Sequence, residues 1–290
     1  MKRLWIATLF VSVTAACGAD EPVGTPTGPT TTATVAASHV SLVGYVLDTA
    51  FRSLPGATVT VADGPHAGLS TTTDADGRFS LAGLFGSATE FRATRDGYLG
   101  ATQTWRCSAA PCPTNGRPWL GFYLAAVEAP TNIAGDYELT LTADAACTDL
   151  PPEVRTRTYA ATVSPRSSAY HPAGTLFDVM TPGTPTAFGD IYGITLGVIG
   201  RDIGFGLYGD HNPFLVELIA PTTYLAFSGS APAVSLGPGA VSAITTSFEG
   251  TIEYCEMNRP MSSHYECGQS QARAPVHCES TQHRLTLTRR

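Results

Sequence analysis

Two aspartates, Asp74 and Asp76, stand before Gly77 in the order in which many calcium-binding loops begin. A complete loop needs further oxygen ligands and a closing carboxylate, and the next acidic residue after Gly77 is Glu90. The same residue types form tight turns, because aspartate accepts hydrogen bonds from nearby backbone and glycine tolerates positive φ. We therefore expect a structural hairpin turn at 74–77, with Asp74 and Asp76 as weak calcium candidates.

A second motif, GFGLYG at 204–209, matches the GxGxxG pattern of dinucleotide-binding loops. Such a loop needs a helix that begins within the motif, whereas DHNP at 210–213 predicts a turn. We interpret the glycines as bare positions of a curved strand that allow close packing. His211 beside Asp210 supplies half of a catalytic triad, but no GxSxG or HExxH motif accompanies it. We therefore predict no catalytic residue and no cofactor.

Three aromatic residues, Trp105, Trp119 and Tyr123, flank the segment 107–112. Exposed aromatic rings offer flat faces on which the rings of a sugar can stack. At alternate positions of one strand, however, Trp119 and Tyr123 are more typical of core packing. The three residues are therefore weak ligand-stacking candidates.

The N-terminus has the features of an export signal. A basic pair, Lys2-Arg3, precedes an apolar run at 4–13 that is too short to cross a bilayer as a helix. Residues 14–17, TAAC, resemble the lipobox of bacterial lipoproteins, with threonine in place of the usual leucine. The resemblance implies a signal peptide at 1–16, lipidation of Cys17 and, because Gly18 follows, an outer-membrane address in the bacterial cell envelope. Ordinary cleavage nearby, which leaves Cys17 as a spare thiol, is the alternative.

The composition excludes several classes of protein. Lys2 is the only lysine, so beyond residue 16 there are 15 arginines and 24 acidic residues, a formal charge of 15 minus 24, or −9. An acidic chain without lysine repels the negatively charged phosphate backbone of nucleic acids, so we predict no nucleic-acid partner. It also excludes lysine Schiff bases and P-loops. Residues 17–38 are rich in Thr, Pro, Gly and Ala, and predict an unfolded tether.

Six cysteines remain beyond Cys17, and an even number in an exported chain is typical of disulfides. Proximity along the chain favours two pairs, Cys107 with Cys112 and Cys255 with Cys267. Cys147 and Cys278 would then join the start and the end of the second domain. A zinc site near the C-terminus, with His264, His277 and His283, is the alternative. It is disfavoured because the spacings lack Cys-x-x-Cys pairs and the compartment is oxidising. We expect these histidines to lie on a disulfide-bound loop.

Residues 39–127 consist of short β-rich segments separated by Gly, Pro and Asp turns, the pattern of a β-sandwich. Four motifs follow in order: GYV at 44–46, LPGATVTV at 54–61, TDADGRF at 73–79 and DGY at 96–98. Together they resemble the carboxypeptidase regulatory-like family, a transthyretin-like sandwich grouped with carbohydrate-binding-like folds. The resemblance implies that the turn at 74–77 joins two adjacent strands and directs Phe79 into the core.

Residues 132–290 contain about eight further β-rich segments. With the first and last joined by Cys147 and Cys278, we expect a disulfide-closed antiparallel barrel or sandwich, so the whole chain is predicted to be all-β. Only FLVELIA, at 214–220, is a candidate for a short helix. GDY at 135–137 is similar to the start of lipocalin-like barrels, with tyrosine for the characteristic tryptophan. The region also resembles an uncharacterised bacterial β family without an assigned activity.

Taken together, the sequence predicts a non-catalytic envelope lipoprotein that acts as a binding module. Carbohydrate is the ligand class that the relatives of the first domain imply. The alternatives are a lipocalin-like carrier of a small apolar ligand and a structural or adhesive accessory protein. The expected partners are the membrane, through the anchor, and a glycan or a small apolar ligand. A hydrolase is disfavoured because no catalytic constellation is evident.

Overall fold

The computed structural model describes residues 41–83, 85, 88–106, 119–184, 193–208, 213–260, 267 and 272–290. Several expectations lie outside these residues: the export signal, lipidation of Cys17, the tether at 17–38, the Cys107–Cys112 pair, and any role of Asp210, His211 or His264. No helix in the described ranges is long and apolar enough to span a membrane.

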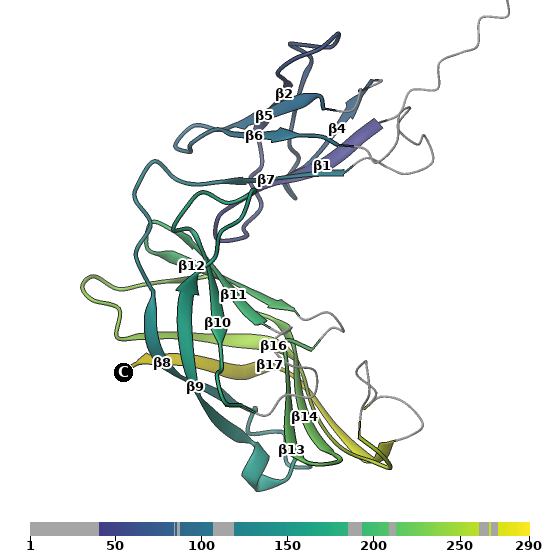
Figure 1. Ribbon diagram of the computed structural model, residues 1–290, viewed down its shortest axis with the longest axis vertical. Coiled ribbons are helices and arrows are strands. Elements are labelled where there is room, and N and C mark those ends of the chain that lie inside the picture. Colours follow the sequence, from purple (N-terminus) through teal and green to yellow (C-terminus); the bar gives the residue numbers. More distant parts are fainter. Residues whose placement is uncertain are drawn as a thin grey trace, which may run out of the picture. The chain divides into compact units, whose positions relative to one another are not determined.

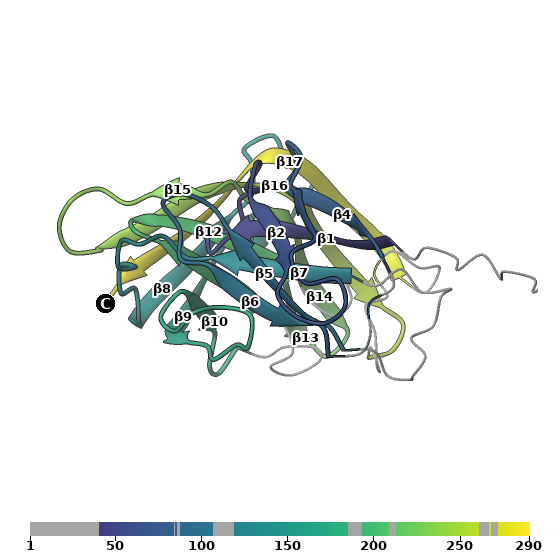
Figure 2. The same cartoon turned by 90° about the horizontal axis from the view of Figure 1, so that it is seen from above.

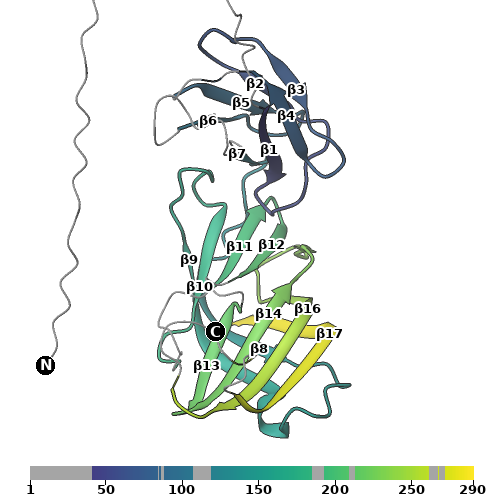
Figure 3. The same ribbon diagram turned by 90° about the vertical axis from the view of Figure 1, so that its right-hand side faces the viewer.

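Two small sheets form the first part of the chain, which we call the sandwich (41–124). One has the strand order β4-β1-β7 and the other β3-β2-β5-β6, with β1 and β7 parallel and the remaining pairs antiparallel (Figures 2 and 3). The strands are β1 (Ser41–Asp48), β2 (Thr58–Val61), β3 (Ser70–Thr72), β4 (Arg78–Ala82), β5 (Glu90–Thr94), β6 (Ala101–Thr104) and β7 (Trp119–Leu124). Alternate apolar residues of both sheets, such as Val46, Val59 and Phe122, form one shared core.

The turn at 74–77 is held by its own aspartate. The Asp74 carboxylate accepts hydrogen bonds from the N–H groups of Asp76 (3.0 Å) and Arg78 (2.8 Å). Gly77 has φ +72°, and Phe79 is buried in the core as the family resemblance implied. The hairpin expectation needs correction, because β3 pairs with β2 whereas β4 pairs with β1. The turn therefore carries the chain from one sheet to the other.

Gly77 is expected to resist substitution for two separable reasons. A Cβ atom there would lie 2.6 Å from the carbonyl oxygen of Val46, whereas Gly56, with φ +71°, has nothing within 4 Å of that position. We expect Gly56→Ala to cost about 1 kcal/mol, the penalty for positive φ, and Gly77→Ala to cost about 2–3 kcal/mol because the clash adds to it. Urea unfolding of both variants measures the difference. If both lost the same free energy of unfolding, the close approach to Val46 would contribute nothing to the cost at Gly77.

The second part of the chain, which we call the half-barrel (135–289), is one antiparallel sheet of ten strands. Its order is β13-β14-β16-β17-β8-β9-β10-β11-β12-β15 (Figures 1 and 3). The strands are β8 (Gly135–Thr142), β9 (Thr156–Pro165), β10 (Leu176–Met180), β11 (Gly193–Ile199), β12 (Asp202–Tyr208), β13 (Leu215–Ala220), β14 (Thr223–Ser230), β15 (Val234–Ser235), β16 (Ala243–Met257) and β17 (Ala272–Arg289), and a 3₁₀ turn, η1, spans Pro152–Val154. The last strand, β17, returns to pair with β8.

The prediction of an all-β chain is confirmed, with two differences in the half-barrel. The sheet is an open curl whose end strands are β13 and β15, and the segment 214–220 forms β13 instead of a helix. Leu215 pairs with Phe227 of β14, so β13 and β14 are a hairpin. One face of the curled sheet carries the main core, to which Tyr137, Phe227 and Phe248 contribute.

Two of the expected disulfides are present in the described residues, Cys147–Cys278 and Cys255–Cys267. Such bonds indicate an extracytoplasmic location. His277 pairs with Glu253 (2.5 Å), and no group of residues suited to a metal ion occurs in the described ranges. His283 corrects an expectation, because it is fully buried beside the ring of Phe248 instead of lying on a loop.

Candidate functional site

The alternation of β7 determines which of its aromatic residues face solvent. Leu120, Phe122 and Leu124 point into the sandwich core. Trp119 and Tyr123 lie on the opposite face, where Trp119 is 57% exposed. The expectation that Trp119 and Tyr123 pack in the core is therefore wrong, because the intervening residues already fill it.

Tyr45 of β1 completes this outer aromatic surface. It is the neighbour of Gly121 in the β1–β7 register, and a Cβ atom at Gly121 would lie 2.9 Å from the Tyr45 ring. The ring lies edge-on to Trp119 (4.5 Å between centroids) and to Tyr123 (5.9 Å), and the two tyrosine hydroxyls are 2.9 Å apart. Burial, followed by the hydrogen bond with Tyr123, raises the pKa of Tyr45, so its hydroxyl stays protonated.

These rings line a groove of about 840 Å³. Its lining combines aromatic rings with hydroxyl, amide and guanidinium groups: Tyr45, Trp105, Trp119, Tyr123 and Tyr170, with Thr102, Gln103, Thr104 and Arg106. β6 and β7 are the end strands of the two sandwich sheets, and Tyr170 comes from the segment between β9 and β10 of the half-barrel. The groove thus brings together all three aromatic residues singled out in the sequence.

A second layer of rings fixes Tyr123 from behind. His171 stacks on Tyr123 with ring centroids 3.9 Å apart, and Phe51 is edge-on to both rings. Burial, together with the charge of Arg166, lowers the pKa of His171 to about 4. Its imidazole is therefore neutral at physiological pH and serves as a flat packing surface.

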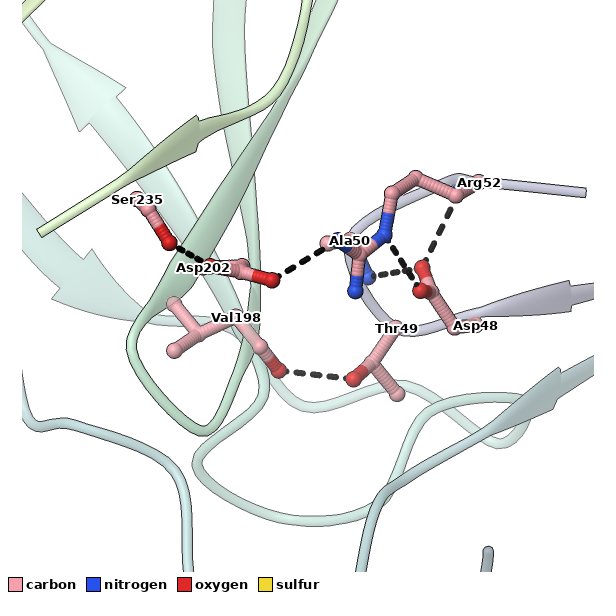
Figure 4. A network of polar contacts seen from close by, with 7 residues as sticks. All are labelled: Asp48, Thr49, Ala50, Arg52, Val198, Asp202 and Ser235. Atoms are coloured by element: carbon pink, nitrogen blue, oxygen red, sulfur yellow. Dashed lines mark hydrogen bonds and ion pairs between the residues drawn. The ribbon is translucent and has the colours of Figure 1, made fainter. Parts of the chain in front are cut away.

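The loop that follows β1 joins the sandwich to the half-barrel through polar contacts (Figure 4). The buried Asp48 accepts hydrogen bonds from Ala50 N–H (2.8 Å), Arg52 N–H (3.0 Å) and Arg52 Nε (2.7 Å). Arg52 also donates to Asp202 of β12 (2.7 Å), and the Thr49 hydroxyl donates to the carbonyl of Val198 on β11 (2.6 Å). This network keeps Phe51 beside the groove at φ +65°, a conformation that costs non-glycine residues energy.

Two glycines of the half-barrel make room for this loop. A Cβ atom at Gly197 would lie 2.0 Å from the Thr49 carbonyl oxygen, and one at Gly204 would lie 1.8 Å from that of Ala50. Gly204 opens the GxGxxG motif, which lies in the strand β12 as far as the described residues extend. The motif thus contributes close packing, in agreement with the strand interpretation.

Sequence reasoning missed the other groove residues, among them Tyr45, Tyr170 and Arg106. Tyr45 had a usable signal, because Leu42, Gly44 and Val46 alternate with it and occupy the buried face of β1. Tyr170 had none, since it lies in a connection between strands. Arg106 adjoins a stacking candidate, but a single arginine carries no pattern.

Comparisons with known proteins support the family resemblance for the sandwich. Residues 41–110 match the family model of the carboxypeptidase regulatory-like domain. Among curated proteins, none matches this chain. A solved structure from Bacteroides fragilis, a protein of unknown function described provisionally as membrane-associated, covers 86% of this chain and 97% of its own at 10% identity. Its TM-score of 0.23 carries no structural argument. The family that matches is that of a regulatory-like domain.

Proposed function

We propose that this protein is a non-catalytic, lipid-anchored protein of the bacterial cell envelope that binds carbohydrate in the aromatic groove. One observation carries the proposal: Trp119 and Tyr170, 57% and 58% exposed, line the same groove. Exposed rings of this kind can stack on sugar faces, and neighbouring Thr102 and Gln103 can hydrogen-bond sugar hydroxyls. Sites for small ligands typically combine apolar and aromatic surface with a few polar groups, and this groove contains both kinds of group.

The envelope location rests on the export signal and on the lipobox-like TAAC that ends at Cys17. The two disulfides support an oxidising compartment. A single acyl signal holds a protein weakly, whereas two or more chains on one cysteine give a stable anchor. The full chain should therefore sediment with membranes, and Cys17→Ala should release it, whereas a variant that still sediments would contradict lipidation.

Binding is tested by a glycan array followed by calorimetric titration of the full chain that carries Cys17→Ala. We expect Trp119→Ala to weaken glycan binding by about tenfold or more, because a stacking contact of this size is worth at least about 1.4 kcal/mol. The control is Leu99→Ala, because Leu99 is 51% exposed and does not line the groove. Binding of no glycan at millimolar concentration, or equal binding by both variants, would overturn the proposal.

The remaining alternatives, an apolar-ligand carrier and a structural or adhesive accessory, stay predictions. Large side chains such as Tyr137, Phe177 and Phe248 already occupy the core of the half-barrel. No feature in the described parts of the chain favours either alternative over the groove.

A further inference from the structure

We propose that the groove takes an acidic saccharide, a sugar that carries a carboxylate, and that Arg106 recognises this carboxylate. The inference rests on the proposed function, because it names the ligand class of the same groove. It follows from the distribution of charge around the groove and from the use of arginine elsewhere in the molecule.

The lining of the groove differs in charge from the protein as a whole. The chain has 24 acidic residues against 17 basic ones. Among the described residues that line the groove, Arg106 is the one charged group, and neither aspartate nor glutamate is present. A lining with one guanidinium group and no carboxylate among its described residues attracts an anion, because no like charge there repels it.

Arg106 is also available to a ligand. Some arginines are engaged in ion pairs within the described residues, as Arg52 is with Asp48, and Arg157 with Glu217. Arg106 is exposed and forms no ion pair with any residue that the structure describes. Its planar guanidinium can bind both oxygens of a carboxylate at once, which a lysine could not do.

The neighbouring groups suit the remainder of a sugar. Thr102 and Thr104 lie on the exposed side of β6, shortly before Arg106 in the sequence, and Trp119 offers a ring face in the same groove. The hydroxyl of Tyr45 stays protonated, so it adds no negative charge beside the ligand. One saccharide unit could therefore stack on a ring, donate to threonine hydroxyls and present its carboxylate to Arg106.

The experiment compares matched trisaccharides by calorimetric titration of the full chain that carries Cys17→Ala. The probes are the trimers of galacturonate, glucuronate and mannuronate, each beside its neutral hexose counterpart. We expect one uronate to bind about tenfold more tightly than its neutral counterpart, and this preference to fall as salt is raised. Arg106→Gln should remove the preference, so that each acidic trimer and its neutral counterpart bind with equal affinity. The control is Arg284→Gln, which removes the same charge from an exposed position on β17 and should keep the preference.

The outcomes separate the inference from the proposed function. Equal binding of neutral and acidic trimers would overturn the inference and leave carbohydrate binding intact. A preference that survives Arg106→Gln would overturn the role of Arg106. If a hexaglutamate peptide bound as tightly as the uronate, the groove would recognise negative charge alone. That result would overturn the proposal that its ligand is a saccharide. Binding of no trimer at millimolar concentration would overturn both proposals.

Discussion

Replacing Cys147 and Cys278 by alanine is expected to lower the free energy of unfolding by about 5 kcal/mol. The bond joins the segment after β8 to β17 across a sequence separation of 131 residues. In the unfolded chain it closes a long loop, and its loss restores the conformational entropy of that loop. The variant should still fold, because β8 and β17 pair through backbone hydrogen bonds without the bond. Denaturant unfolding under oxidising conditions measures the change.

The second disulfide provides the matched control. Cys255 and Cys267 are 12 residues apart, so the double alanine variant at these positions should lose about 3 kcal/mol. The order of the two effects tests the explanation by loop entropy. If the short loop proved the more stabilising of the two, packing around Cys255 and Cys267, which are both fully buried, would be the dominant cause.

A second large effect is expected at Glu217, a buried carboxylate on the end strand β13. Arg157 of β9 donates to it through both Nε (2.9 Å) and a terminal nitrogen, and the Tyr159 hydroxyl donates at 2.8 Å. Four strands separate β13 from β9 in the sheet order. The three side chains therefore connect parts of the curled sheet that no backbone pairing joins.

Glu217→Leu should lower the free energy of unfolding by about 3–5 kcal/mol, because it leaves a guanidinium and a buried hydroxyl without their acceptor. Burial, followed by the Glu217 charge, raises the pKa of Tyr159, so the hydroxyl is a neutral donor that needs this acceptor. The measurement is urea unfolding at pH 7, compared with the triple variant Glu217→Leu, Arg157→Leu, Tyr159→Phe.

The triple variant removes the whole network and should regain most of the lost stability, because no polar group is left unpaired. A single variant that loses less than about 1 kcal/mol would show that Arg157, which is 32% exposed, finds water in place of Glu217. In that case the triple variant should have the lower free energy of unfolding of the two, because it also loses the packing of the Arg157 side chain.

The strands that could be predicted from the sequence are those with one buried face. Tyr137, Leu139 and Leu141 alternate with polar residues because only one side of β8 meets the core. β13 could not be predicted in this way, since Leu215 faces the main core and Val216 belongs to a second apolar cluster. A strand buried on both faces reads as a continuous apolar run, which periodicity does not distinguish from a short buried helix.

The groove was partly predictable for the same physical reason. In WLGFYL, large apolar residues occur on both faces of the strand. The sequence alone therefore does not decide whether Trp119 and Tyr123 or the residues between them face the core. That choice is made by the neighbouring strand, where Val46 of β1 faces inward and Tyr45 faces outward. Tyr170 joins the groove from the connection between β9 and β10, and only the three-dimensional fold brings it there.

The absence of side chains at Gly197 and Gly204 has a consequence for recombination between related proteins. The carbonyl groups of Thr49 and Ala50 occupy the space that any side chain at these glycines would need. A sandwich exchanged with that of another protein would fit the half-barrel only if it kept the course of the loop after β1. The two parts have separate cores, yet they should be inherited together and diverge as a single evolutionary unit.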